Sequence, residues 1–192
     1  MSEQVVLVDA DGRAIGTQLK SEVHHGATPL HLAFSAYLFR PDGALLVSRR
    51  ALDKATFPGV WSNSVCGHPA PGERLRDAVQ RRASQELGIR VASLHLVLPR
   101  FSYRAEMDGV VEHELCPVYA GVSADDPKPD ASEVAQLEWV AWGEFERDVT
   151  AGRRVVSQWC REQVAALRAL GPDPLGWPQA DPGELPPACP TE

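Results

Sequence analysis

An apolar run near the start of the chain places the strongest constraint on its fold. Residues 31–39 read HLAFSAYLF, and after His31 the only strongly polar side chain is that of Ser35. A strand that is exposed on one face alternates apolar and polar residues, whereas a run without that alternation is typical of a buried strand. We therefore expect residues 31–39 to form a well-buried strand.

Further strands and two helices are predicted around this run. Apolar side chains at helical spacing predict helices over residues 74–87 and 155–170, each followed by a glycine that would end it. Strands that are interrupted by helices indicate an α+β fold, or a sandwich around a mixed sheet. The other predicted strands cover residues 4–8, 14–19, 44–50, 61–68, about 92–106, 110–120 and about 134–141.

The length of the chain and its C-terminal composition predict one domain with a tail. The 192 residues suit a single globular domain, which we place at residues 1–171. Residues 172–192 contain seven prolines and few large apolar side chains. We expect this segment to be a loosely packed tail.

Composition argues against several classes of protein. The formal net charge of −7 disfavours a general binder of nucleic acid or of a membrane surface. No apolar stretch is long enough to span a bilayer, and the first residues do not resemble a secretory signal. We expect a cytoplasmic protein, a monomer or weak homodimer, whose four cysteines are free thiols.

Residues 67–89 contain a motif that points to phosphate chemistry. The segment GHPAPGERLRDAVQRRASQELGI has a glycine, a glutamate six residues later, and a helix that ends in Glu-Leu-Gly-Ile. It resembles the Nudix box, whose helix glutamates hold a divalent metal that binds a diphosphate. Here Arg82 and Gln85 stand where a Nudix hydrolase has acidic ligands, and Glu86 remains. The resemblance implies a member of the superfamily that has lost its hydrolytic carboxylates.

Helical geometry gives Glu86 a position on the inner face of that helix. Glu86 follows Leu75 by eleven residues, about 20° away at roughly 100° per residue. A carboxylate on an apolar face is costly unless it is paired or bound to metal. An ordinary ion pair with Arg82, one turn earlier, would also explain the position.

Histidines and strand carboxylates form a second candidate metal site. Residues two apart on a strand point to the same face, so Glu112 and Glu114 would project together. A cation relieves the repulsion between two such carboxylates. Three imidazoles with two carboxylates suit a divalent transition metal or Mg²⁺ better than a structural tetrahedral zinc site. The candidate ligands are His24, His31, His68, Glu112 and Glu114.

Several longer strings carry a resemblance to one family. They are residues 31–39 (HLAFSAYLF), 48–54 (SRRALDK), 57–69 (FPGVWSNSVCGHP), 101–105 (FSYRA) and 112–118 (EHELCPV). Together they resemble type 1 isopentenyl-diphosphate isomerases of the Nudix superfamily, over roughly residues 4–165. The resemblance implies a Nudix-type α/β/α sandwich with a mixed sheet. It also implies interconversion of isopentenyl and dimethylallyl diphosphate in isoprenoid biosynthesis.

The resemblance also assigns roles to single residues. Cys66 and Glu114 match the two groups that transfer protons on opposite sides of the hydrocarbon. Family spacing selects His24 rather than the adjacent His25 as a ligand of the His/Glu metal, which is Mn²⁺, Zn²⁺ or Mg²⁺. Tyr103 and Trp159 match aromatic residues of the site, although plain packing would also explain both. A second ion, Mg²⁺, would bridge the diphosphate to Glu86 and the backbone carbonyl of Cys66. The diphosphate would be bound by Lys20, Arg50, Lys54 and Arg82.

Two other functions remain open at this point. A Nudix hydrolase of a nucleoside or sugar diphosphate would release phosphate, but it requires glutamates that this helix lacks. A non-catalytic metal- or diphosphate-binding domain would leave Cys66 without a chemical role. An isolated cysteine is in general more often a buried structural thiol than a catalytic one.

Overall fold

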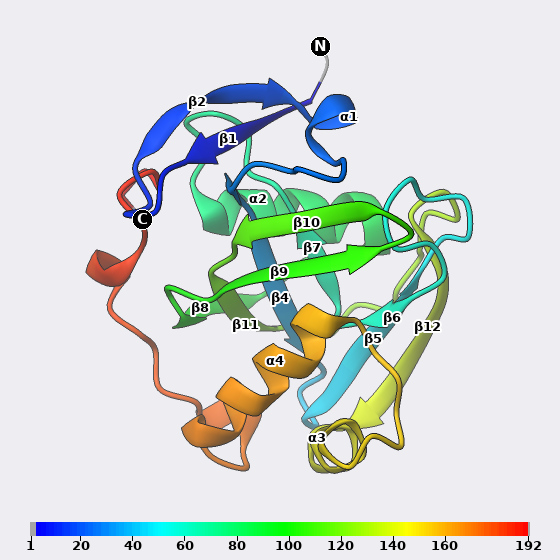
Figure 1. Ribbon diagram of the computed structural model, residues 1–192. Coiled ribbons are helices and arrows are strands. Elements are labelled where there is room, and N and C mark those ends of the chain that lie inside the picture. Colours follow the sequence, from blue (N-terminus) through cyan, green and yellow to red (C-terminus); the bar gives the residue numbers. More distant parts are fainter. Residues whose placement is uncertain (1–2, 192) are drawn as a thin grey trace.

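A seven-stranded mixed sheet forms the centre of the molecule (Figure 1). The computed structural model describes residues 3–191. Five strands run in the order β12-β5-β4-β11-β8, while β6 pairs with β5 and β7 pairs with β4. The β4–β11 pair is parallel and the other pairs are antiparallel. The strands are β4 (Phe34–Phe39), β5 (Ala44–Arg50), β6 (Trp61–Ser62), β7 (Val65–Gly67), β8 (Ser93–Leu98), β11 (Val118–Val122) and β12 (Val134–Ala141).

A second sheet has five strands, of which β1 and β2 are drawn at the top of Figure 1 and β9 and β10 across its centre. Its order is β2-β1-β3-β10-β9, and β3 and β10 are parallel, with Glu114 opposite His31. The chain therefore passes between the sheets three times, at Ala33, between β8 and β9, and between β10 and β11. These strands are β1 (Gln4–Val8), β2 (Ala14–Leu19), β3 (His31–Leu32), β9 (Ser102–Met107) and β10 (Val110–Leu115).

Helices cover both faces of the central sheet. Phe34 and Leu38 of β4 pack with the cluster that includes α2 (Leu75–Arg82), and Tyr37 and Phe39 pack with the cluster that includes α3 (Trp142–Thr150) and α4 (Gln158–Leu167). Alternate side chains of one strand thus enter two cores, as the period of a strand requires. This arrangement confirms the predicted α/β/α sandwich. The remaining helical segments are α1 (Lys20–Val23), η1 (Ala83–Leu87), η2 (Arg168–Leu170), η3 (Pro174–Gly176) and η4 (Pro182–Glu184).

The predicted elements are present, but several have different limits. The two long strands predicted over residues 92–106 and 110–120 each divide between the two sheets. Pro99 and Pro117 lie at the divisions, where a residue without an N–H interrupts a strand ladder. The helix predicted over 74–87 ends in a π-helical turn, and α3 was not predicted. The helix predicted to begin at residue 155 begins at Gln158, because the Ser157 side chain caps it by accepting from the Cys160 N–H at 3.2 Å.

The C-terminal segment packs against the domain more closely than expected. The side chains of Trp177 and Leu185 are buried, and the Ala188 N–H donates to the Gly12 carbonyl at 2.9 Å. Figure 1 shows the segment running from the end of α4 to the turn between β1 and β2. The expectation of a loose tail therefore does not hold for its described part, residues 172–191. The four cysteines, all within residues 3–191, form no disulfides. Among the helices over residues 3–191, none combines the length and apolar character that crossing a bilayer requires.

Candidate active site

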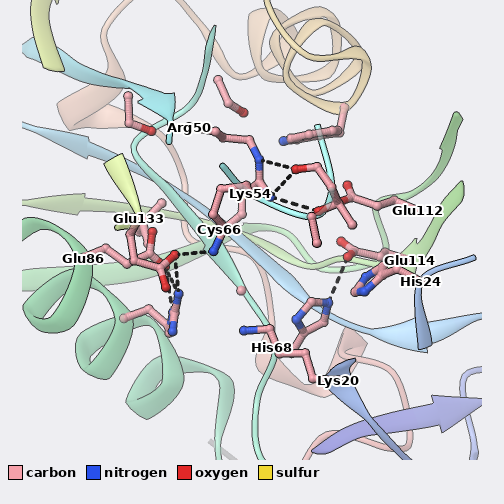
Figure 2. A pocket seen from close by; sticks show the side chains of 18 of the residues that line it. Lys20, His24, Arg50, Lys54, Cys66, His68, Glu86, Glu112, Glu114 and Glu133 are labelled. Carbon is pink, nitrogen blue, oxygen red and sulfur yellow. Dashed lines mark hydrogen bonds and ion pairs between the residues drawn. The ribbon is translucent and has the colours of Figure 1, made fainter. Parts of the chain in front are cut away.

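A cavity of about 570 Å³ contains nearly all of the side chains that the sequence predicted for the site. Its lining comes from both sheets, from α2 and α4, and from the loop after β5. His31 is the one predicted residue outside the lining, because it is fully buried behind His68. In the view of Figure 2, Glu86 and Glu133 lie to one side of Cys66, while Glu112 and Glu114 lie to the other. The predicted residues that line the cavity are Lys20, His24, Arg50, Lys54, Cys66, His68, Arg82, Glu86, Tyr103, Glu112, Glu114 and Trp159.

Four of the predicted metal ligands meet at one end of this cavity. One ligand atom from each of the four lies within 4.8 Å of the others. The strand register explains half of this group, because Glu114 of β10 lies opposite His31 of β3. The other two ligands directly follow short elements: His24 follows α1, and His68 follows β7. The group consists of His24, His31, His68 and Glu114.

The nitrogens of this group are arranged to share a cation. The His31 Nδ1–H donates to the Pro29 carbonyl at 2.9 Å, which directs Nε2 toward His68 Nε2 at 3.2 Å. Two such nitrogens repel unless a proton or a cation lies between them. The buried His24 Nε2 has no hydrogen-bond partner within residues 3–191, as a metal ligand would require. Burial first, and then the neighbouring imidazoles, lower the pKa of His24 to about 4, so its ring is neutral and able to bind metal.

Glu112 lies outside this group of four, although the sequence predicted it as a ligand. It lies two residues before Glu114 on β10. It pairs with Ala105 of β9, and β3, the strand that carries His31, does not reach it. Its Oε2 is 3.0 Å from the Tyr103 hydroxyl, which is also 2.8 Å from Glu114 Oε2. The two carboxylates therefore face the same cavity and are joined through one phenol.

The two carboxylates differ in acidity. Burial and the charge of Glu114 raise the pKa of Glu112 to about 7. Burial also opposes ionisation of Glu114, but hydrogen bonds from His31 and His68 outweigh it and hold its pKa well below the usual value. Glu114 is therefore the more acidic member of the pair, because the histidines stabilise its charged form.

Cys66 presents its thiol to the cavity within a defined set of hydrogen bonds. Its Sγ donates to Asn63 Oδ1 at 3.2 Å and lies 3.3 Å from the Ser35 hydroxyl. Ser35 in turn accepts from the buried Gln163 amide at 2.9 Å, so its own proton is free to point to sulfur. Burial is the main reason that the pKa of Cys66 rises to about 12. The side chain is thus an oriented, protonated thiol.

Aromatic side chains form an apolar wall of the cavity. The ring of Trp159 is 5.4 Å from that of Tyr103 and 5.1 Å from that of Phe57, between centroids. Trp159 and Tyr103 line the cavity, and both are almost fully buried. A dry aromatic face of this kind attracts positive charge.

Ion pairs join three cations with three carboxylates at one end of the cavity, Lys20, Lys54 and Arg82 with Glu3, Glu86 and Glu133. Arg82 Nε donates to Glu86 Oε1 at 2.7 Å, so the predicted alternative, an ion pair one helical turn apart, is present. Lys54 Nζ is 2.6 Å from Glu133 Oε2, and Lys20 Nζ is 2.7 Å from Glu3 Oε2. Burial is the largest influence on Glu86 and raises its pKa. This end can bind an anion and, at Glu86, a cation.

Several residues of the site escaped prediction. Glu133 and Glu3 line the cavity, but neither belongs to a recognisable motif. Asn63 lies within the string WSNSVCGHP, but the string by itself assigns no role to this residue. Ser35 and Gln163 are 128 residues apart in sequence and meet only through the fold.

Comparisons with known proteins identify the family. The NUDIX domain family model matches residues 29–160. An isopentenyl-diphosphate Delta-isomerase from Saccharopolyspora erythraea is 54% identical, over 97% of this chain and 97% of that protein. One from Rhizobium rhizogenes is 53% identical, over 99% and 92%.

Solved structures agree on the fold. A protein from Deinococcus radiodurans, DR0079, has a TM-score of 0.65 at 22% identity, covering 85% of this chain and 98% of its own. A MutT protein from Methanosarcina mazei Go1 has a TM-score of 0.59 at 20% identity, covering 73% and 94%. This chain belongs to the NUDIX family and, within it, to the isopentenyl-diphosphate Delta-isomerases.

Proposed function

We propose that this enzyme interconverts isopentenyl and dimethylallyl diphosphate in the cavity described above, and that Cys66 and Glu114 transfer the two protons. The observation that carries the proposal is that a thiol and a charged carboxylate line one cavity with an aromatic wall and a cationic end. The names of the relatives support the reaction. The geometry of the cavity supports the roles proposed for Cys66 and Glu114.

The reaction requires two proton transfers that balance each other. In isopentenyl diphosphate the terminal methylene carbon gains a proton, and the double-bond electrons form the new C–H bond. Positive charge then develops on the tertiary carbon. The carbon that lies between the tertiary carbon and the CH₂–O group then loses a proton. The new double bond forms between this carbon and the tertiary carbon. One group gives a proton and a second group takes one, so neither redox chemistry nor phosphate release is needed.

The side chains around the cavity suit each step. Asn63 and Ser35 fix the direction of the Cys66 sulfur, and the histidines fix the Glu114 carboxylate. Trp159 and Tyr103 provide aromatic surface for the developing positive charge, an effect of roughly 2 kcal/mol or more in a dry site. The aromatic wall also keeps water away from the cationic carbon, which water would otherwise capture.

Two divalent metals complete the proposed site. The donors His24, His31, His68 and Glu114 fit a Mn²⁺, Zn²⁺ or Mg²⁺ ion, and we propose Glu112 as a fifth ligand after a rotation of its side chain. The cavity-facing, buried Glu86, together with the Cys66 backbone carbonyl, would hold Mg²⁺. When bound, these ions supply positive charge that orients the carboxylates and neutralises the phosphate oxygens. Lys20, Arg50, Lys54 and Arg82 would hold the diphosphate.

An isotope experiment tests the reaction. Purified protein with Mg²⁺ and Mn²⁺ should convert isopentenyl to dimethylallyl diphosphate in deuterated water, with deuterium entering the product and no phosphate released. A Nudix hydrolase would release phosphate from a nucleoside diphosphate sugar and leave isopentenyl diphosphate unchanged. That result would reject the proposal.

The role of the thiol is tested by substitution. Cys66→Ala should abolish turnover, because one of the two proton-transferring groups is removed, while the metal content measured by elemental analysis stays the same. Cys189→Ala is the matched control, because Cys189 forms no disulfide and lies outside the lining of the cavity. Near-normal turnover in the Cys66 variant would remove this residue from the mechanism.

A further inference from the structure

Glu133 occupies a position that a diphosphate would compete for. Its Oε2 atom is 2.6 Å from Lys54 Nζ and 3.3 Å from Arg82 Nη2. A single carboxylate oxygen is thus shared by two of the four cations proposed to bind the diphosphate. Its side chain is 25% exposed and lines the cavity. An incoming phosphate oxygen would approach the same two cations.

The backbone holds Glu133 firmly at this place. It directly precedes β12, and Val134 pairs with Arg50 of β5. The Glu133 carbonyl accepts from the Ala51 N–H at 3.0 Å, and its own N–H donates to the Asp130 carbonyl at 3.0 Å. The side chain can rotate away from an anion, but its charge stays at the cationic end of the cavity.

A second carboxylate lies close to the first. Glu86 Oε1 accepts from Arg82 Nε at 2.7 Å, so Arg82 lies between two carboxylates. In a partly buried site, the repulsion between a highly charged diphosphate and these two groups is only weakly screened. A divalent cation on the phosphate oxygens would turn that repulsion into attraction, because carboxylates are good ligands for Mg²⁺.

We infer that Glu133 makes binding of a diphosphate conditional on its divalent cation, so that the site selects the magnesium complex over the metal-free anion. The inference rests on the proposed function, in that Lys54 and Arg82 are the residues that receive the diphosphate. Glu133 acts as a specificity-determining residue, because it penalises one form of the substrate and keeps Lys54 and Arg82 at the cavity wall in the absence of substrate.

Titration with inorganic pyrophosphate tests the inference without relying on turnover. Binding is measured by calorimetry in the presence and absence of Mg²⁺, without chelator, so that metal in the histidine group is retained. In Glu133→Gln the amide is nearly isosteric and loses only the charge. The Mg²⁺-free affinity should rise about tenfold, which corresponds to about 1.4 kcal/mol, and the enhancement by Mg²⁺ should fall by the same factor.

A matched variant separates a local effect from the change in net charge. Glu138→Gln removes a carboxylate from β12, the strand that Glu133 precedes, where Glu138 pairs with Arg154 outside the lining of the cavity. This control should keep the wild-type enhancement by Mg²⁺. An equal shift in Glu138→Gln would overturn the inference.

An unchanged or weaker Mg²⁺-free affinity in Glu133→Gln would also overturn it, because that result would mean that Glu133 only orients Lys54. The proposed function would remain intact if the wild-type protein isomerises isopentenyl diphosphate, whatever the pyrophosphate affinity of Glu133→Gln. The two ideas therefore fail in different experiments.

Discussion

Glu112 and Glu114 show what the period of a strand can predict at the scale of single residues. Their spacing predicted that both would project from one face, and both line the cavity. The spacing could not show that His31 lies opposite Glu114, because that register is set by the pairing of β3 with β10. Residues two apart on a strand are separated by roughly 6.6 Å, so only one of them lies beside the histidines.

The metal-binding role of Glu112 can be tested directly. Glu112→Gln retains the size of the side chain and its contact with Tyr103, but it removes the charge. If Glu112 rotates to become the fifth ligand, the affinity for Mn²⁺ or Zn²⁺ should fall at least tenfold, as roughly 10–100-fold losses follow even changes to groups that only support a ligand. Competition with a chromogenic chelator measures this affinity.

Glu106→Gln provides the comparison for this test. Glu106 lies on the neighbouring strand β9, and its side chain is 57% exposed and outside the lining of the cavity. The variant should bind metal as the wild type does. Equal affinity in wild type and both variants would limit the metal ligands to the group of four.

Glu133 marks the limit of prediction from single residues. Its partners Lys54 and Arg82 are 79 and 51 residues away in the sequence, and no motif joins them. The motifs that carry the family resemblance could be recognised because each lies within one short segment, such as residues 57–69. A contact between three distant segments depends on the register of β12 with β5.

At the scale of elements, local patterns predicted which segments form strands and helices better than how these segments connect. The prolines that divide the long strands were visible in the sequence, but their effect on sheet membership was not. Helix α3 was missed because it follows β12 directly and begins with the apolar residue Trp142. Its buried side chains Trp142, Phe145 and Val149 nevertheless have helical spacing.

The helix formed by α2 and η1 ends at Gly88, and this end depends on the conformation of the glycine. This glycine has φ +66°, and a Cβ added to it would lie 2.8 Å from the Lys128 carbonyl oxygen. Gly88→Ala should therefore lower the free energy of unfolding by more than the roughly 1–2 kcal/mol expected for a left-handed conformation alone. Urea unfolding measures the change.

Gly72→Ala isolates the conformational part of this cost. Gly72 has φ +78°, but nothing lies within 4 Å of the added Cβ. The two variants should differ by the contact with Lys128. If their stabilities are equal, the close approach between the helix end and residue 128 contributes nothing to the fold.

At the scale of the whole molecule, the C-terminal segment contacts the cores on both faces of the central sheet. Trp177 packs against Trp142 and Phe39, with ring centroids 5.0 and 5.8 Å away, on the core that contains α3 and α4. Leu185 belongs to the opposite core, and Ala188 bonds to the β1–β2 turn. The proline content and the scarcity of large apolar side chains predicted a loosely packed tail. The composition could not show that isolated apolar side chains of this segment would be buried against the domain.

Removal of one of these anchors should destabilise the fold without disabling the site. Trp177 is 4% exposed, and its Nε1–H donates to the Gly171 carbonyl at 2.9 Å. Trp177→Ala should lower the free energy of unfolding by roughly 3–5 kcal/mol, as expected for a large buried aromatic residue. Leu175→Ala, two residues earlier and 40% exposed, should cost well under half as much. Because neither side chain lines the cavity, both folded variants should retain wild-type kcat for the isomerisation. Equal and small losses of stability would mean that the segment is only loosely attached, whereas a loss of kcat in folded Trp177→Ala would mean that it shapes the active site.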